Sequence, residues 1–239
     1  MRAGQRKPDE PREVRITRAF TASSPGSVLI EAGRTRLLCT ATVENQVPQW
    51  LRGTDSGWVT AEYAMLPGST GQRKPRESRT GKPDARSLEI QRLIGRSLRA
   101  VTNLKAFPDK AVWLDCDVLE ADGGTRTLAV TGAWVALHDA FAWMEDQGLL
   151  ESWPLRTQVA AVSVGLVGGL PLLDLDYQED SQAEVDLNVV MTREGEFVEI
   201  QGTAEREPFP REALDRLLDL AERGIRKILE VQTRAVAPA

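Results

Sequence analysis

The sequence predicts an α+β fold in which mixed β-sheets pack against roughly three helices. Two patterns carry this prediction: short runs that alternate apolar and polar residues, and longer segments whose apolar residues recur at helical spacing. The chain has 239 residues, of which 41% are hydrophobic, so it can bury a large core. We therefore expect a single domain over residues 1–239.

Composition excludes several functional classes. The net charge of −5 argues against a surface coated with nucleic acid, although a local basic patch is compatible with it. Cys39 and Cys116 lie in predicted strands and are expected to be buried rather than disulfide-bonded. A lone histidine, His138, argues against a His-based triad or a His/Cys metal cluster. No apolar stretch approaches the roughly 20 residues of a membrane span, so a cytoplasmic protein without a membrane partner is expected.

The first third of the chain is expected to form an arm followed by strands. Residues 1–18 are charged and contain prolines, which predicts either a free tail or an N-terminal arm that touches a polyanion. Val28–Glu31 and Arg36–Val43 are rich in β-formers and flank Ala-Gly-Arg-Thr, which predicts a hairpin. Trp58–Met65 alternates and is expected to form another strand.

Residues 66–86 are expected to form a basic loop, because repeated glycine and proline disfavour regular structure there. The basic side chains are Arg73, Lys74, Arg76, Arg79, Lys82 and Arg86. Such a loop is either solvated and mobile or binds phosphate backbones. Its lack of aromatic residues favours binding by charge over base stacking.

A helix, a strand and a second helix are expected next. Ser87 is the predicted N-cap of the first helix, and Arg86 directly precedes it. Ala111–Glu120 alternates as a strand, and a helical period then runs from Val130 to Met144.

The intervening Gly123-Gly124-Thr125-Arg126 is a candidate anion site. Glycines let main-chain amides approach an anion, and a helix start presents free N–H groups. The Thr125 hydroxyl and the Arg126 guanidinium suit phosphate oxygens. A tight turn with a capping threonine is an equally simple interpretation, and no Walker motif occurs.

The remaining chain predicts four strands, then a helix and a tail. Val159–Gly165 and Leu170–Leu175 are joined across glycines, and Ala183–Thr192 and Phe197–Gly202 form a second expected hairpin. A final helix follows Pro208–Pro210, and residues 234–239 are expected to fray.

The stretch from Asp174 to Asn188 carries six carboxylates between apolar segments. They are Asp174, Asp176, Glu179, Asp180, Glu184 and Asp186. Crowded acids near a core are costly unless a divalent metal, a basic loop or both neutralise them. Alternation from Glu184 predicts that Asp186 projects from a sheet whose other face is core. A solvated acidic turn without a function is the alternative.

Five motifs resemble the ribonuclease PH family of phosphate-dependent 3′-to-5′ exoribonucleases and nucleotidyltransferases. They occupy residues 36–44, 57–70, 84–99, 120–126 and 175–186, and include Glu-Ala-Asp-Gly-Gly-Thr-Arg and Leu-Asp-Tyr-Gln-Glu-Asp-Ser-Gln-Ala-Glu-Val-Asp. The resemblance covers almost the whole chain. It implies a ribosomal protein S5 domain 2-like α+β fold and a homohexameric ring built as a trimer of dimers. It also implies action on the 3′ ends of tRNA precursors and other structured RNA, and not on DNA.

The same resemblance places the family's functional residues in three groups. They are phosphate-binding Arg86, Gly124, Thr125 and Arg126; catalytic and Mg²⁺-holding Asp180 and Asp186; and RNA-binding Arg73 and Arg76. Inorganic phosphate is then the nucleophile, nucleoside diphosphates are released, and nucleotide addition is the reverse reaction. Whether Asp180 binds the ion or donates a proton to the leaving 3′ oxygen stays open.

Three other functions are compatible with these residues. One is a catalytically inactive RNA-binding ring subunit of an exosome-like complex, which need not keep the full set of site residues. The second is a metal-dependent RNA hydrolase, which would release monophosphates without phosphate. The third is an RNA-binding module without catalysis.

Overall fold

The first half of the chain forms a five-stranded sheet with the order β1-β2-β3-β5-β4. The computed structural model describes residues 2, 5–76 and 84–237. The strands are β1 (Val14–Arg18), β2 (Gly26–Ala32), β3 (Thr35–Glu44), β4 (Trp58–Met65) and β5 (Ala111–Glu120). Neighbours are antiparallel except for β4 and β5, which are parallel. The crossover between β4 and β5 contains a helix, as parallel pairing requires.

The second half forms a four-stranded antiparallel sheet with the order β7-β6-β8-β9. Its strands are β6 (Val159–Val167), β7 (Leu170–Leu173), β8 (Val185–Thr192) and β9 (Phe197–Ala204). The helices are α2 (Ala85–Ala100), α3 (Thr125–Asp146), α4 (Tyr177–Asp180) and α5 (Arg211–Val236), with short 3₁₀ turns η2 (Gln49–Leu51) and η3 (Leu104–Ala106). The predicted α+β class is therefore confirmed.

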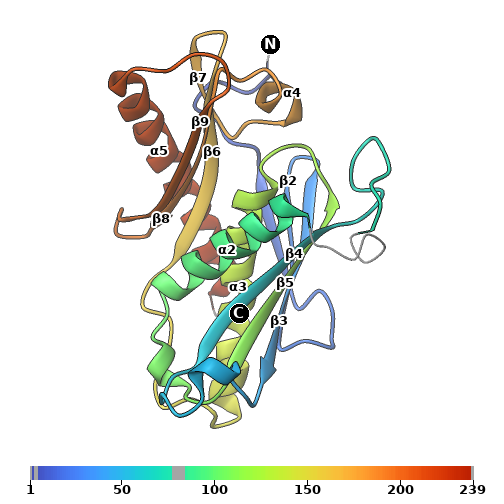
Figure 1. Cartoon of the computed structure of the whole chain (residues 1–239), viewed down its shortest axis with the longest axis vertical. Helices are drawn as coiled ribbons and strands as arrows, with labels where there is room; N and C mark the ends of the chain where they lie inside the picture. The colour runs from blue at the N-terminus through green and yellow to red at the C-terminus, as the bar shows by residue number, and fades with distance from the viewer. Residues whose placement is uncertain (1, 3–4, 77–83, 238–239) are drawn as a thin grey trace.

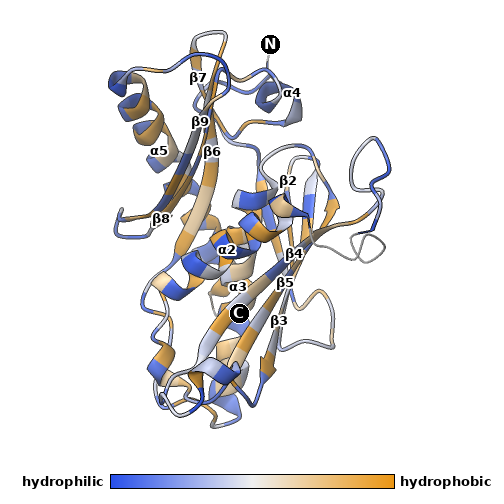
Figure 2. Cartoon of the chain, in the orientation of Figure 1, coloured by the Kyte–Doolittle hydropathy of each residue, from blue (hydrophilic) through white to orange (hydrophobic). Residues whose placement is uncertain are grey.

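Helix α3 lies between the two halves, because it packs on β2 and β3 of the first sheet and on β6 of the second (Figure 1). Its buried residues occur all around the helix, as expected for an element with neighbours on every side. Helix α5 covers the other face of the second sheet and is strongly amphipathic, which the orange and blue stripes of Figure 2 show. Strand β6 is thus covered on both faces.

The side chains of strand β8 show where each face of the second sheet points. Val185, Leu187 and Val189 are buried in the cluster that packs against α5. Because successive side chains alternate, Asp186 and Asn188 point to the opposite face, toward the first half of the chain. The prediction that Asp186 projects from a sheet with a core on its reverse face is confirmed.

The N-terminal segment is part of the fold, so of the two alternatives left open for residues 1–18 the free tail is wrong. Val14–Arg18 forms the edge strand β1, which the sequence analysis missed. Only two apolar residues, Val14 and Ile16, alternate with the exposed Arg15 and Thr17, and the third inward position is Arg18, so the pattern is short. Among the described residues, no helix is long and apolar enough to cross a membrane.

Two other predicted boundaries are corrected. Helix α2 begins at Ala85 with Asp84 as its N-cap, so Ser87 lies inside the first turn and Arg86 is already helical. The basic loop therefore ends before residue 85, and its residues 77–83, with Arg79 and Lys82, lie outside the described part of the chain. At the C-terminus, α5 continues to Val236, so residues 234–236 of the predicted tail are helical.

Candidate active site

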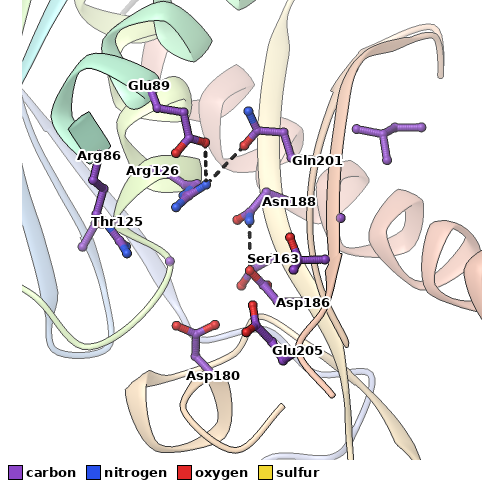
Figure 3. Close-up of a pocket in the computed structure, with 14 residues that line it drawn as sticks. Arg86, Glu89, Thr125, Arg126, Ser163, Asp180, Asp186, Asn188, Gln201 and Glu205 are labelled. Atoms are coloured by element: carbon purple, nitrogen blue, oxygen red, sulfur yellow. Dashed lines mark hydrogen bonds and ion pairs between the residues drawn. The ribbon is translucent and has the colours of Figure 1, made fainter. Parts of the chain in front are cut away.

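A polar cavity of about 670 Å³ lies where β8 and β9 face the first turns of α2 and α3 (Figure 3). Its lining residues are Arg86, Glu89, Gly124, Thr125, Arg126, Ser163, Asp180, Asp186, Asn188, Ile200, Gln201, Gly202, Thr203 and Glu205. All six residues predicted for phosphate binding and catalysis line this one cavity. The two oppositely charged motifs, far apart in the sequence, therefore share a site.

The cationic wall is built from two helix starts. Arg86 and Arg126 are the second residues of α2 and α3, where the partial positive charge of each helix adds to that of the side chain. The Arg126 guanidinium donates from Nη1 to Glu89 Oε1 at 3.1 Å and to Gln201 Oε1 at 3.2 Å. These contacts hold the guanidinium at the cavity while other N–H groups stay available for an anion.

Gly124 is the N-cap of α3 and has a φ of 67°, a left-handed conformation that glycine adopts without strain. It supplies no capping side chain, so the first N–H groups of α3 are left for a ligand or solvent. The adjacent Thr125 hydroxyl lies 2.8 Å from the Tyr63 hydroxyl. Burial raises the pKa of Tyr63 despite this contact, so Tyr63 remains a neutral partner.

The acidic wall consists of Asp186 on β8 and Asp180 at the end of α4. Burial is the main cause that raises the pKa of Asp186 to about 6; the charge of Asp180 adds to it, and Arg126 opposes it. Burial likewise raises the pKa of Asp180, although Arg86 and Arg126 oppose the change. The carboxylates are therefore costly to ionise together.

Asp186 also has an unused oxygen. Its Oδ2 accepts from Asn188 Nδ2 at 3.3 Å, whereas the buried Oδ1 has no hydrogen-bond partner among the described residues. A buried carboxylate oxygen without a partner is unusual and points to a ligand that would complete the site.

The donor set fits Mg²⁺ in part. The described residues contain no group of three His, Cys, Asp or Glu side chains arranged to hold a metal ion. Two carboxylates facing a cationic wall nevertheless suit Mg²⁺, which usually takes one or two protein carboxylates together with waters and substrate phosphates.

Four of the six crowded acids do not line the cavity, and three of these four pair with arginines. Asp174, Asp176 and Glu179 are paired with Arg2, Arg6 and Arg12 of the N-terminal segment. The expectation that a metal or the basic loop neutralises the whole stretch is therefore wrong for these three, because the arm does so. The arm therefore contacts the chain's own acidic stretch.

The predicted RNA-binding residues lie outside the cavity. Arg73 and Arg76 are exposed in the segment that follows β4. Glu184, another of the six acids, accepts a hydrogen bond from the Gly169 main chain at the β6–β7 turn.

The sequence analysis missed several cavity residues, above all Glu89, Ser163, Gln201 and Glu205. Ser163 and Gln201 flank Asn188 on the two neighbouring strands, so the cross-strand register aligns all three. Alternation in β9 could have indicated which of its residues share a face, but only the register shows which face meets the cavity.

The fold and the cavity together define a member of the 3′ exoribonuclease family. The family model for domain 1 matches residues 10–142, and that for domain 2 matches residues 157–224. These ranges correspond to the halves that carry the two sheets. The chain therefore belongs to this family.

Within the family, the chain groups with ribonuclease PH. It is 56% identical over 237 residues to "Ribonuclease PH" of Methylobacterium radiotolerans, covering 99% of this chain and 100% of that protein. It is 54% identical to "Ribonuclease PH" of Methylorubrum populi over the same shares of the two chains.

Solved structures share the fold at low sequence identity. Rice (Oryza sativa) Rrp46 superposes with a TM-score of 0.80 at 16% identity, covering 99% of this chain and 100% of that one. A chain of the Archaeoglobus fulgidus exosome with RNA bound to its active site superposes with a TM-score of 0.81 at 23% identity, covering 96% and 91%.

Proposed function

We propose that this chain is a phosphate-dependent 3′-to-5′ exoribonuclease that trims the 3′ ends of tRNA precursors and other structured RNA. Inorganic phosphate attacks the terminal phosphorus, the bond to the 3′ oxygen breaks, and a nucleoside diphosphate leaves. Nucleotide addition is the reverse reaction, because one phosphate linkage replaces another. The observation that carries this proposal is the single cavity in which a cationic helix-start wall faces two buried acids.

The cationic wall binds the attacking phosphate in this proposal. Arg86 and Arg126 neutralise its charge, and the Thr125 hydroxyl and the free N–H groups after Gly124 bind its oxygens. Phosphoryl transfer depends mostly on positioning and charge neutralisation, so no nucleophilic side chain is needed.

The acidic wall acts on the other side of the reacting phosphorus. Asp180 and Asp186 would hold Mg²⁺, which supplies charge neutralisation at the phosphate oxygens when bound. The raised pKa values of both acids also allow either to carry a proton. Asp180 either shares the Mg²⁺ ion or returns a proton to the leaving 3′ oxygen.

RNA binding is assigned to the basic loop outside the cavity. Arg73 and Arg76 are exposed and free to contact the phosphate backbone of the RNA body, while only its 3′ end enters the cavity. The ring-forming assembly that the motifs imply, a homohexamer built as a trimer of dimers, belongs to the same proposal.

A digest of a 3′-extended tRNA precursor with Mg²⁺, with and without inorganic phosphate, tests the proposal. We expect shortening only with phosphate, and nucleoside diphosphates as products. Monophosphates formed without phosphate would establish hydrolysis instead. No shortening under any condition would favour the inactive ring subunit. The presence of all six predicted residues at the cavity argues against that outcome, because an inactive subunit need not keep them.

A further inference from the structure

The turn that carries Gly123 and Gly124 is held by Arg12, a residue of the N-terminal segment that does not line the cavity. Arg12 Nη1 donates to the Asp122 carbonyl at 2.7 Å, and Nη2 donates to the Gly123 carbonyl at 3.3 Å. Thr35 strengthens the same anchor, because its hydroxyl donates to the Gly123 carbonyl at 2.8 Å and accepts from the Asp122 N–H at 3.0 Å.

The same guanidinium forms a buried ion pair with Asp174. Arg12 Nε donates to Oδ2 at 2.9 Å and Nη2 donates to Oδ1 at 2.6 Å, while the Arg12 main-chain N–H also donates to Oδ2 at 2.7 Å. The exposed fractions of the two side chains are only 8% and 10%. One arginine therefore binds the turn and the acidic stretch simultaneously, and its planar group fixes their relative position.

Asp174 lies at the start of the segment that leads to Asp180. Two residues later, Asp176 forms a capping box with Glu179, which starts the short helix that ends at Asp180. The turn packs directly on this segment, because a Cβ on Gly123 would lie 2.5 Å from the Leu175 carbonyl oxygen. Displacing the turn would therefore disturb both walls of the cavity.

We propose that Arg12 and Asp174 form a positioning pair that sets the phosphate-binding turn in register with the segment carrying Asp180. This inference rests on the proposed function. A trans peptide directs its carbonyl and its N–H in opposite directions, so fixing the Gly123 carbonyl also fixes the Gly124 N–H. Arg12 thus acts through the turn, and RNA binding by the basic loop does not depend on it.

Four variants separate positioning from simple stabilisation. Arg12→Lys keeps the charge but cannot span Asp174 and both carbonyls. Thr35→Val removes the second anchor and leaves the ion pair intact, whereas Thr35→Ser retains the hydroxyl. Arg18→Lys is the matched control, because Arg18 forms a comparable pair with Asp139 at 2.7 Å and neither residue lines the cavity.

The full-length variants are compared in phosphorolysis assays, with separate KM values for phosphate and RNA, and in thermal unfolding. We expect Arg12→Lys and Thr35→Val to raise the KM for phosphate roughly tenfold or more, because small misplacements of binding groups are costly. The KM for RNA should stay near that of the wild type. Thr35→Ser should behave as wild type, and Arg18→Lys should lower the Tm without changing the KM for phosphate.

Phosphate titration by calorimetry gives a second readout that does not need turnover. If Arg12→Lys does not fold, Thr35→Val alone tests the positioning role. An unchanged phosphate KM in folded Thr35→Val and Arg12→Lys would overturn the positioning role while leaving the proposed function intact. An equal rise in Arg18→Lys would also overturn it, since general destabilisation would then suffice. A wild-type protein without phosphate-dependent turnover would instead overturn the proposed function.

Discussion

Arg126 and Glu89 meet at the edge of the cavity, where the arginine donates from Nη1 to the glutamate Oε1 at 3.1 Å. The arginine side chain is 17% exposed and the glutamate side chain is 48% exposed. In the proposed function a phosphate group must share this arginine with the carboxylate. Glu89 therefore holds the arginine in place and also places a negative charge beside the incoming anion.

Glu89→Gln should lower the KM for phosphate by a few fold, because it removes that charge and keeps a hydrogen-bond acceptor for Arg126. The effect should be small, since half-exposed ion pairs contribute about 0.2–1 kcal/mol. Steady-state phosphorolysis at several phosphate concentrations measures it. A large increase in the KM would mean that Glu89 mainly positions Arg126.

Arg126→Ala should weaken phosphate binding by about 2–3 kcal/mol, because it removes a charged hydrogen-bond donor from the cationic wall. RNA binding should remain close to wild type, since the predicted RNA-binding residues lie elsewhere. Calorimetric phosphate titration and RNA gel shifts report the two effects separately. Arg223→Ala, an exposed arginine on α5, is the control and should change neither.

Arg73→Ala and Arg76→Ala should each weaken RNA binding and leave the KM for phosphate unchanged. The slope of log K against log salt should become shallower by about 0.7–0.9 for each lost phosphate contact. Filter binding over a series of salt concentrations measures this slope. Arg211→Ala, whose side chain is 85% exposed, is the control. If Arg73→Ala and Arg76→Ala had the same salt slope as Arg211→Ala, the basic loop would not be part of the RNA-binding surface.

Asp186→Asn should reduce turnover on the order of 100-fold, the equivalent of about 3 kcal/mol of lost charge stabilisation. In EDTA it should also raise the Tm by about 2–4 °C or more, because a neutral amide is cheaper to bury than a carboxylate. Activity assays and thermal unfolding in EDTA test both effects. Asp115→Asn, another half-buried acid, lies outside the cavity and should leave turnover intact.

Acid should selectively remove the stability that comes from Asp174. Burial alone would raise the pKa of this group, but the hydrogen bond and charge of Arg12 outweigh it, so the folded pKa lies below the ordinary value of 3.8. Its contribution is therefore present above about pH 3.8 and is lost as the pH falls through the lower, folded pKa. Asp174→Asn should cost about 3–5 kcal/mol at pH 7, where the variant leaves Arg12 buried without its partner.

Urea unfolding between pH 3 and pH 7 measures this dependence. The difference between wild type and Asp174→Asn should narrow toward pH 3. Asp215→Asn, whose parent side chain is 56% exposed, should unfold like the wild type throughout. A constant difference at every pH would show that the Asp174 carboxylate is not the titrating group.

The residue patterns within single segments were sufficient to predict much of the fold. Trp58–Met65 and Ala111–Glu120 were predicted with the bounds that β4 and β5 have, because each strand alternates between a buried and a more exposed face. The edge strand β1 was missed, since its local pattern lacks a continuous apolar face.

The candidate site, too, could be predicted from the sequence only in part. Local sequence indicated that the Asp186 side chain points away from the core-facing side of its strand. It also indicated that Gly124, Thr125 and Arg126 lie at the start of a helix. Both inferences are local, because strand alternation and helix starts depend on neighbouring residues. Only the tertiary structure decided that Asp180 reaches the cavity while Asp174 pairs with Arg12. Such pairings are settled by how distant segments pack, and the one-dimensional order of residues contains no measure of that distance.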